Sequence, residues 1–115
     1  MGLPSADTAE IHEAKILGYL LSQTHRTGQS KATFFTKHGF TLERWQLLAD
    51  ALRHQAKTGA VAAAQNTKYG LRYVVDGMLI APDGTRLNVR SVWFINEKTA
   101  RPRFATAHPL KRKGL

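Results

Sequence analysis

The sequence predicts an α+β domain in which N-terminal helices pack on a C-terminal antiparallel four-stranded sheet. Up to Gly59 the apolar residues recur at helical spacing, and after it they alternate with a period of two. The expected strands follow one another without intervening helices, which favours antiparallel pairing. We expect one domain over residues 1–115, with helices within about 8–58, a sheet within about 60–108 and a basic tail at 109–115.

Three helices are expected before Gly59, over residues 8–22, 30–37 and 42–58. Each follows or begins with a residue whose side chain can cap the first turn; these are Asp7 (with Glu10 three positions later), Ser30 and Thr41. The third helix has the clearest apolar stripe, which consists of Leu42, Trp45, Leu48, Ala49, Leu52 and Ala56.

Four strands are expected after Gly59. "AVAAAQ" is a weak strand, and "LRYVVDGMLIAPDGTRLNVRSVWFIN" is a hairpin that turns at Pro82-Asp83-Gly84. "RPRFATAH" is the last strand, and Pro102 suits its first position. Within Arg86–Asn96 the odd positions are the more apolar and should face the helices, so Asn88 and Arg90 should lie on the opposite, open face.

The charge points to an anionic partner. Lys and Arg number 17 against 8 Asp and Glu, for a net charge of +9, and all of the excess lies from residue 25 onward. A basic domain of this size favours a nucleic acid first, an acidic protein second and a membrane surface third. The chain has no cysteine, no apolar run long enough to span a membrane and no recognisable signal peptide.

The residue types favour metal-independent RNA cleavage. The acidic residues form no cluster at a telling spacing and the five histidines form no His-x-x-x-His pair, so we expect neither a catalytic metal nor a cofactor. RNA can be cut when its own 2′-hydroxyl attacks the adjacent phosphate, which requires proton transfer and stabilisation of a charged phosphorane. Suitable side chains are those of His25, Ser30, Lys31, Arg90, Thr106 and His108.

Each candidate also has an ordinary structural interpretation. Ser30 can serve as a helix cap alone, and Arg90 can pair with Asp76 across the hairpin. His25 can be an ordinary loop residue, and Thr106 is a good strand residue without any active site. Trp45 and Trp93, by contrast, are expected in the core.

Several motifs resemble those of an uncharacterised family of small bacterial domains. "YLLSQTHRTGQSKATFF", "KYGLRYVVDG", "VRSVWFIN" and "RFATAHP" are similar to the family's H-x-x-G-x-S-K-A-x-F-F, Y-G-x-R-Y and T-A-Y-P patterns, over about residues 17–109. The order of helices, sheet and terminal T-A-x-P also resembles the wider group of metal-independent ribonuclease toxins that includes barnase, EndoU, colicin D and RelE. His108 departs from the pattern, which has tyrosine at that position.

The resemblance implies an endoribonuclease toxin, either an interbacterial effector or the toxin of a toxin–antitoxin pair, that acts in the bacterial cytoplasm. Its implied partners are RNA (tRNA, rRNA or mRNA) and an acidic immunity protein or antitoxin. The implied catalytic residues are His25, Lys31, Arg90, Thr106 and His108, with acid and base unassigned between the two histidines. Substrate binding is assigned to Ser30, Tyr69, Asn88 and Arg103. The alternatives are a non-catalytic nucleic-acid-binding module and a module that binds an acidic protein.

Overall fold

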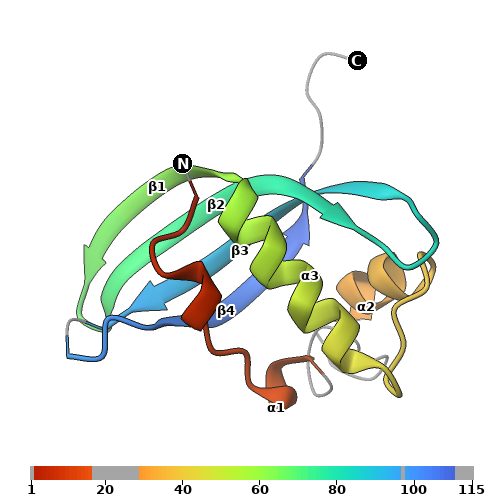
Figure 1. The fold of residues 1–115 in the computed structure, drawn as a ribbon, viewed down its shortest axis with the longest axis horizontal. Helices are drawn as coiled ribbons and strands as arrows, with labels where there is room; N and C mark the ends of the chain where they lie inside the picture. Colours follow the sequence, from red (N-terminus) through yellow and green to blue (C-terminus); the bar gives the residue numbers. More distant parts are fainter. Residues whose placement is uncertain (1, 17–28, 97, 111–115) are drawn as a thin grey trace.

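The computed structural model describes residues 2–16, 29–96 and 98–110, without the side chains of residues 29–31. It confirms the α+β fold class (Figure 1). A short 3-10 helix, η1, precedes three α-helices and four strands. Their bounds are η1 Ala6–Thr8, α1 Glu13–Lys15, α2 Gln29–Thr36, α3 Trp45–Thr58, β1 Ala60–Thr67, β2 Gly70–Ile80, β3 Arg86–Ile95 and β4 Pro102–Pro109.

The four strands form one antiparallel sheet in the order β1-β2-β3-β4. The predicted turn at Pro82-Asp83-Gly84 joins β2 to β3, and Gly84 adopts the positive φ of 87° that glycine tolerates best. Pro102 begins β4, as predicted. Because β4 is an edge strand of this sheet, it can begin and end with proline without breaking an interior ladder.

Helix α3 crosses one face of the sheet and buries its apolar stripe there (Figure 1). Leu48, Ala49, Leu52 and Ala56 are buried in the same core as Trp93. On β3 the odd positions do face this core, as the alternation predicts: Leu87, Val89, Ser91 and Trp93 are buried, and Ile95 packs against the core from its edge. The predicted side of the sheet therefore meets the helix.

A chain of buried hydrogen bonds ties α3 to the sheet. The Gln55 side-chain amide donates to the carbonyls of Val75 and Val89, at 3.1 and 2.8 Å. The Ser91 hydroxyl donates to Gln55 Oε1 at 2.6 Å and accepts from the Trp93 indole at 2.8 Å. The buried polar groups of Gln55, Ser91 and Trp93 therefore all have hydrogen-bond partners, as burial in an apolar core requires.

The first predicted helix is wrong over residues 9–12, which follow the 3-10 helix η1 and precede α1. Helix α1 begins only at Glu13, with His12 at its N-cap, and residues 17–22 of the prediction lie outside the described residues. Glu10 is extended rather than helical: its N–H donates to the Pro102 carbonyl and its carbonyl accepts from Phe104. A backbone pairing with β4 thus replaces the expected capping box, because it satisfies donors and acceptors that a helix would have paired internally.

Two other helix starts also differ from the prediction. Helix α2 includes Ser30 in its first turn instead of beginning after it. Helix α3 begins at Trp45, although Thr41 Oγ1 does accept the N–H of Arg44 at 3.3 Å. Leu42 is therefore not part of the buried stripe and is 50% exposed. Its apolar character matched the helical period, but burial in the core did not reinforce that match.

Candidate functional site

The face of the sheet opposite α3 carries the polar and basic side chains of the strands, and we call it the open face. It is defined by Arg72, Val74, Asp76, Met78 and Ile80 of β2, Asn88, Arg90, Val92 and Phe94 of β3, and Arg103, Thr106 and His108 of β4. Along β2 and β3, residues of the open face alternate with residues whose side chains point into the core. The sequence predicted this placement for Arg90 and Asn88, and the pairing register confirms it.

An irregularity in β4 decides which of its side chains reach the open face. Val92 pairs with Thr106, but the next residue of β3, Trp93, pairs with Phe104, so Ala105 is an extra residue without an opposite partner. Strict alternation would place Arg103 and His108 on opposite faces because they are five residues apart. The bulge at Ala105 brings both to the same face.

Asp76, Arg90 and His108 form one row across three neighbouring strands. Asp76 pairs with Arg90 between β2 and β3, and Arg90 pairs with His108 between β3 and β4. Arg90 Nε and Nη2 donate to the two carboxylate oxygens of Asp76 at 2.7 and 2.8 Å. This fork uses one edge of the planar guanidinium and leaves Nη1 outside the Asp76 contact.

The contacts within the row shift the pKa values of Asp76 and Arg90. Hydrogen bonding from Arg90 lowers the pKa of Asp76 and outweighs the opposing effect of its partial burial. The charge of Arg90 adds to the lowering, and so does that of His108 when its ring is protonated. The bond to Asp76 in turn raises the pKa of Arg90. Asp76 therefore remains ionised and Arg90 remains charged in the folded protein at neutral pH.

His108 is oriented by the backbone carbonyl of the next residue, Pro109. Its Nδ1 lies 3.1 Å from the carbonyl oxygen of Pro109. A carbonyl can only accept, so Nδ1 carries the proton in this contact and the neutral ring presents the Nε2 lone pair. A histidine held in this tautomer can take a proton through Nε2.

Two of the other predicted catalytic and substrate-binding residues, Thr106 and Asn88, lie on the open face beside this row. Thr106 lies one row from Arg90, opposite Val92, and Asn88 lies one row away on the other side, opposite Met78. Ser30 and Lys31 lie in helix α2, which contacts β4, but their side chains are not described. His25 lies outside the described residues.

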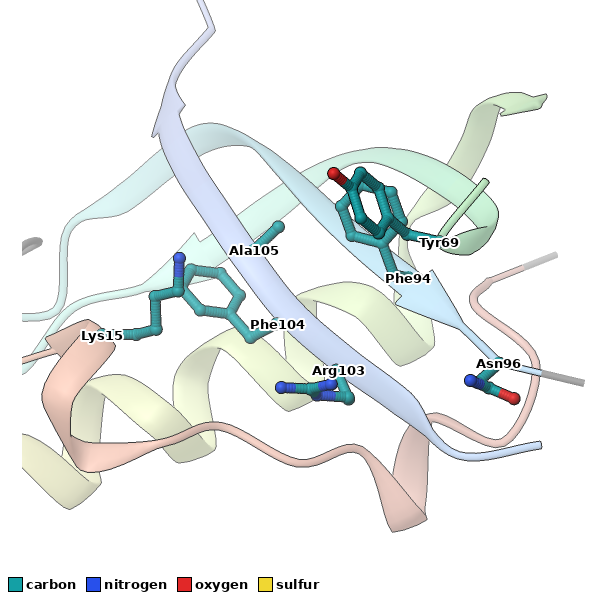
Figure 2. A pocket seen from close by; sticks show the side chains of 7 residues that line it. All are labelled: Lys15, Tyr69, Phe94, Asn96, Arg103, Phe104 and Ala105. Atoms are coloured by element: carbon teal, nitrogen blue, oxygen red, sulfur yellow. The ribbon is translucent and has the colours of Figure 1, made fainter. Parts of the chain in front are cut away.

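Tyr69 and Arg103 belong to a second group at the far end of the open face. They line a cavity of about 260 Å³ together with Lys15, Phe94, Asn96, Phe104 and Ala105 (Figure 2). Phe94 and Arg90 are four residues apart on β3, so this cavity lies about 13 Å from the Asp76–Arg90–His108 row, at 3.3 Å per residue. The predicted site residues therefore divide between two places rather than one.

Sequence reasoning missed several residues at these two places. The sequence predicts Asp76 only as a structural partner of Arg90, yet in the structure it fixes the orientation of the guanidinium. Phe94, Asn96 and Lys15 are not among the predicted site residues, although the even positions of β3 already place Phe94 on the same face as Arg90. No sequence pattern predicts that Lys15 lies at the cavity, because its position depends on how α1 packs against β4.

Among residues 2–16, 29–96 and 98–110, no three His, Asp or Glu side chains come together as a metal site. No helix in this part of the chain is long and apolar enough to cross a membrane.

The fold is similar to that of a known structure. A chain of the "Contact-dependent growth inhibition toxin - immunity protein complex" from Klebsiella pneumoniae 342 superimposes with a TM-score of 0.74, covering 96% of this chain and 100% of that chain at 17% sequence identity. No curated protein matches the sequence. The model of the family described as "Domain of unknown function (DUF6883)" matches residues 2–111, and the chain therefore belongs to this family.

Proposed function

We propose that this chain is the toxic domain of an interbacterial effector and that it cleaves RNA without a metal ion. The fold likeness to a chain of a growth-inhibition toxin–immunity complex supports a place in such a pair. That likeness fits either member of the pair, and the net charge of +9 favours the member that acts on a polyanion. The predicted site of action is the cytoplasm of a target bacterium, and the predicted partner is an acidic immunity protein.

The observation that carries the proposal is the alignment of Arg90 with His108 on the open face. In the proposed reaction a base removes the proton of the 2′-hydroxyl, and the 2′-oxygen bonds to phosphorus. The bond from phosphorus to the 5′-oxygen then breaks, and an acid protonates that oxygen. The products are a 2′,3′-cyclic phosphate and a 5′-hydroxyl.

The side chains of the row suit distinct parts of this reaction. Arg90 supplies positive charge and the Nη1 donors toward the phosphorane, and Asp76 acts as a positioning residue that holds the guanidinium. His108 supplies one proton-transfer group through Nε2. We assign the second proton transfer to His25 and a further phosphate contact to Lys31, as the sequence motif predicts.

One observation favours the alternative of a non-catalytic binding module. Arg90 is already neutralised by two short hydrogen bonds to Asp76, which is how a structural ion pair in a sheet also looks. In that case the basic open face would bind RNA, or an acidic protein, without breaking a bond. The two functions differ in whether a strand is lost, so a cleavage assay separates them.

The test is incubation of the purified protein with total RNA in the presence of EDTA. Wild-type protein should produce fragments that end in a cyclic phosphate. His108→Ala should slow cleavage about 10²- to 10⁴-fold, the usual contribution of a positioned acid or base. His54→Ala is the matched control, because this exposed histidine lies on α3, away from the open face, and its loss should leave the rate unchanged.

Two results would refute the proposal. Intact RNA with the wild-type protein, on both free RNA and ribosomes, would favour the binding module. Full activity of His108→Ala would remove the row from the mechanism even if RNA is cut.

A further inference from the structure

The cavity at the far end of the open face combines aromatic rings, a fixed amide and cations. The rings of Tyr69 and Phe94 meet edge to face, with centroids 6.4 Å apart and an interplanar angle of 84°. Tyr69 is 66% exposed, which is unusual for so large a ring in a small domain. In Figure 2 these two rings lie to one side of β4, and Lys15 lies to the other.

The turn between β1 and β2 is built to present Tyr69. Lys68 and Tyr69 are the two residues between the paired Thr67 and Gly70. Thr67 Oγ1 donates to the Gly70 carbonyl at 2.7 Å and accepts the N–H of Tyr69 at 3.1 Å. Gly70 has a φ of 112°, and a Cβ there would lie 2.5 Å from the Ile95 carbonyl oxygen. A rigid turn with a required glycine therefore holds an exposed ring over the cavity.

Asn96 offers hydrogen-bond donors of known orientation. Its Oδ1 accepts the N–H of Lys98 at 2.8 Å, and this contact identifies which atom of the amide is oxygen. The Nδ2 group then remains as a two-proton donor at the cavity wall. A donor of this kind suits the ring nitrogens and carbonyl oxygens on the edge of a nucleobase.

Cations that have no acidic partner among the described residues line the cavity and the hollow beside it. Lys68 Nζ lies 5.1 Å from the centre of the Tyr69 ring, and Lys98 lines the adjoining hollow beside Asn96 and Arg103. Within the described part of the chain, no ion pair engages Lys15, Lys68, Lys98 or Arg103. Stacking rings bordered by free cations are the combination with which proteins bind unpaired nucleotides.

We propose that this cavity is a subsite for one unpaired nucleobase of an RNA strand that also reaches the Arg90–His108 row. The base stacks on Tyr69, its edge accepts from Asn96, and its flanking phosphates lie against the surrounding cations. The choice of RNA as the ligand rests on the proposed function. The subsite lies about 13 Å along β3 from the row, and there the protein selects single-stranded over paired RNA.

The subsite is tested with a strand that cannot be cleaved. The probe is a single-stranded 2′-O-methyl RNA oligonucleotide, which lacks the attacking hydroxyl, with one 2-aminopurine whose fluorescence falls on stacking. Wild-type protein and Tyr69→Phe should both quench the fluorescence of the probe and should bind it with similar affinity. Tyr69→Ala should bind about 5- to 150-fold more weakly, the range for loss of one base–aromatic stack. Ile80→Ala is the control, because Ile80 is 54% exposed at the opposite end of the same face.

The outcomes separate this subsite from the ribonuclease proposal. If the protein cuts no RNA but Tyr69→Ala loses the quenching, the subsite stands and the proposed reaction falls. Equal affinity of Tyr69→Ala and wild type would overturn the subsite whether or not RNA is cut. It would equally be overturned if nucleoside 5′-monophosphates displaced the probe at its own concentration, since the cavity would then be a site for free nucleotides.

Discussion

At the residue scale, Ser91 joins two buried polar groups that would otherwise lack partners. Its hydroxyl donates to Gln55 Oε1 and accepts from the Trp93 indole. Ser91→Ala leaves that carbonyl oxygen and that N–H unpaired in the core. We expect a loss of about 1–3 kcal/mol in the free energy of unfolding, measured by urea denaturation. Thr58→Ala, which removes an exposed hydroxyl from α3, should change it by less than about 0.5 kcal/mol.

A loss for Ser91→Ala no greater than for Thr58→Ala would mean that water or a shifted side chain replaces the serine. The prediction is thus a test of whether the Gln55–Ser91–Trp93 chain is continuous, and not only of the burial of its members.

Protonation of Asp76 should destabilise the folded protein in acid. Its folded pKa lies below the ordinary 3.8, chiefly because Arg90 donates hydrogen bonds to it. Its ionised form therefore stabilises the native state above pH 3.8, and this contribution disappears as the pH falls through the lowered pKa. The gap in urea midpoint between wild type and Asp76→Asn should be largest at neutral pH and should shrink in acid. A gap that is constant with pH would mean that the carboxylate charge contributes nothing.

At the scale of elements, the sequence predicted best where long-range packing and local pattern agree. The α3 stripe and the β2–β3 hairpin follow their expected periods because each buries one face against the other. Residues 8–12 have a helical pattern too, yet Glu10 pairs with the backbone of β4. Ala9 and Ile11 are buried in this extended segment, so their apolar side chains reach the core without a helix. The periodicity of a single sequence gives no information about pairing with β4, which competes with the helix.

The bulge in β4 shows why the candidate site was only partly predictable. Arg90 and Asn88 were placed on the open face by alternation along a regular strand. In β4, alternation separates Arg103 from His108, and only the extra residue Ala105 reunites them. Nothing in "RFATAH" distinguishes alanine in a bulge from alanine in a regular pair. The cavity beside Tyr69 depends in addition on α1 and on the β1–β2 turn, which no local motif relates to β4.

At the scale of the whole molecule, the described acidic residues and the cations around the Tyr69 cavity differ in whether they form ion pairs. Four of the described acidic residues outside the Asp76–Arg90–His108 row are engaged in ion pairs: Asp7 with Lys57, Asp50 with Arg53, Glu10 with Arg101, and Asp83 with His38. The cations around the Tyr69 cavity have no such partners among the described residues. The positive potential should therefore be concentrated at that end of the open face.

This distribution predicts the salt dependence of RNA binding. Each phosphate neutralised on a single strand contributes about 0.7 to the slope of log affinity against log salt. Replacing Lys68 and Lys98 together with glutamine should lower the slope for the 2′-O-methyl oligonucleotide by about 1.4, because two contacts are lost. Lys57→Gln, which removes a lysine paired with Asp7 on the α3 side, should leave the slope unchanged. Equal reductions per lysine in both variants would show that RNA responds to total charge and that no end of the open face is preferred.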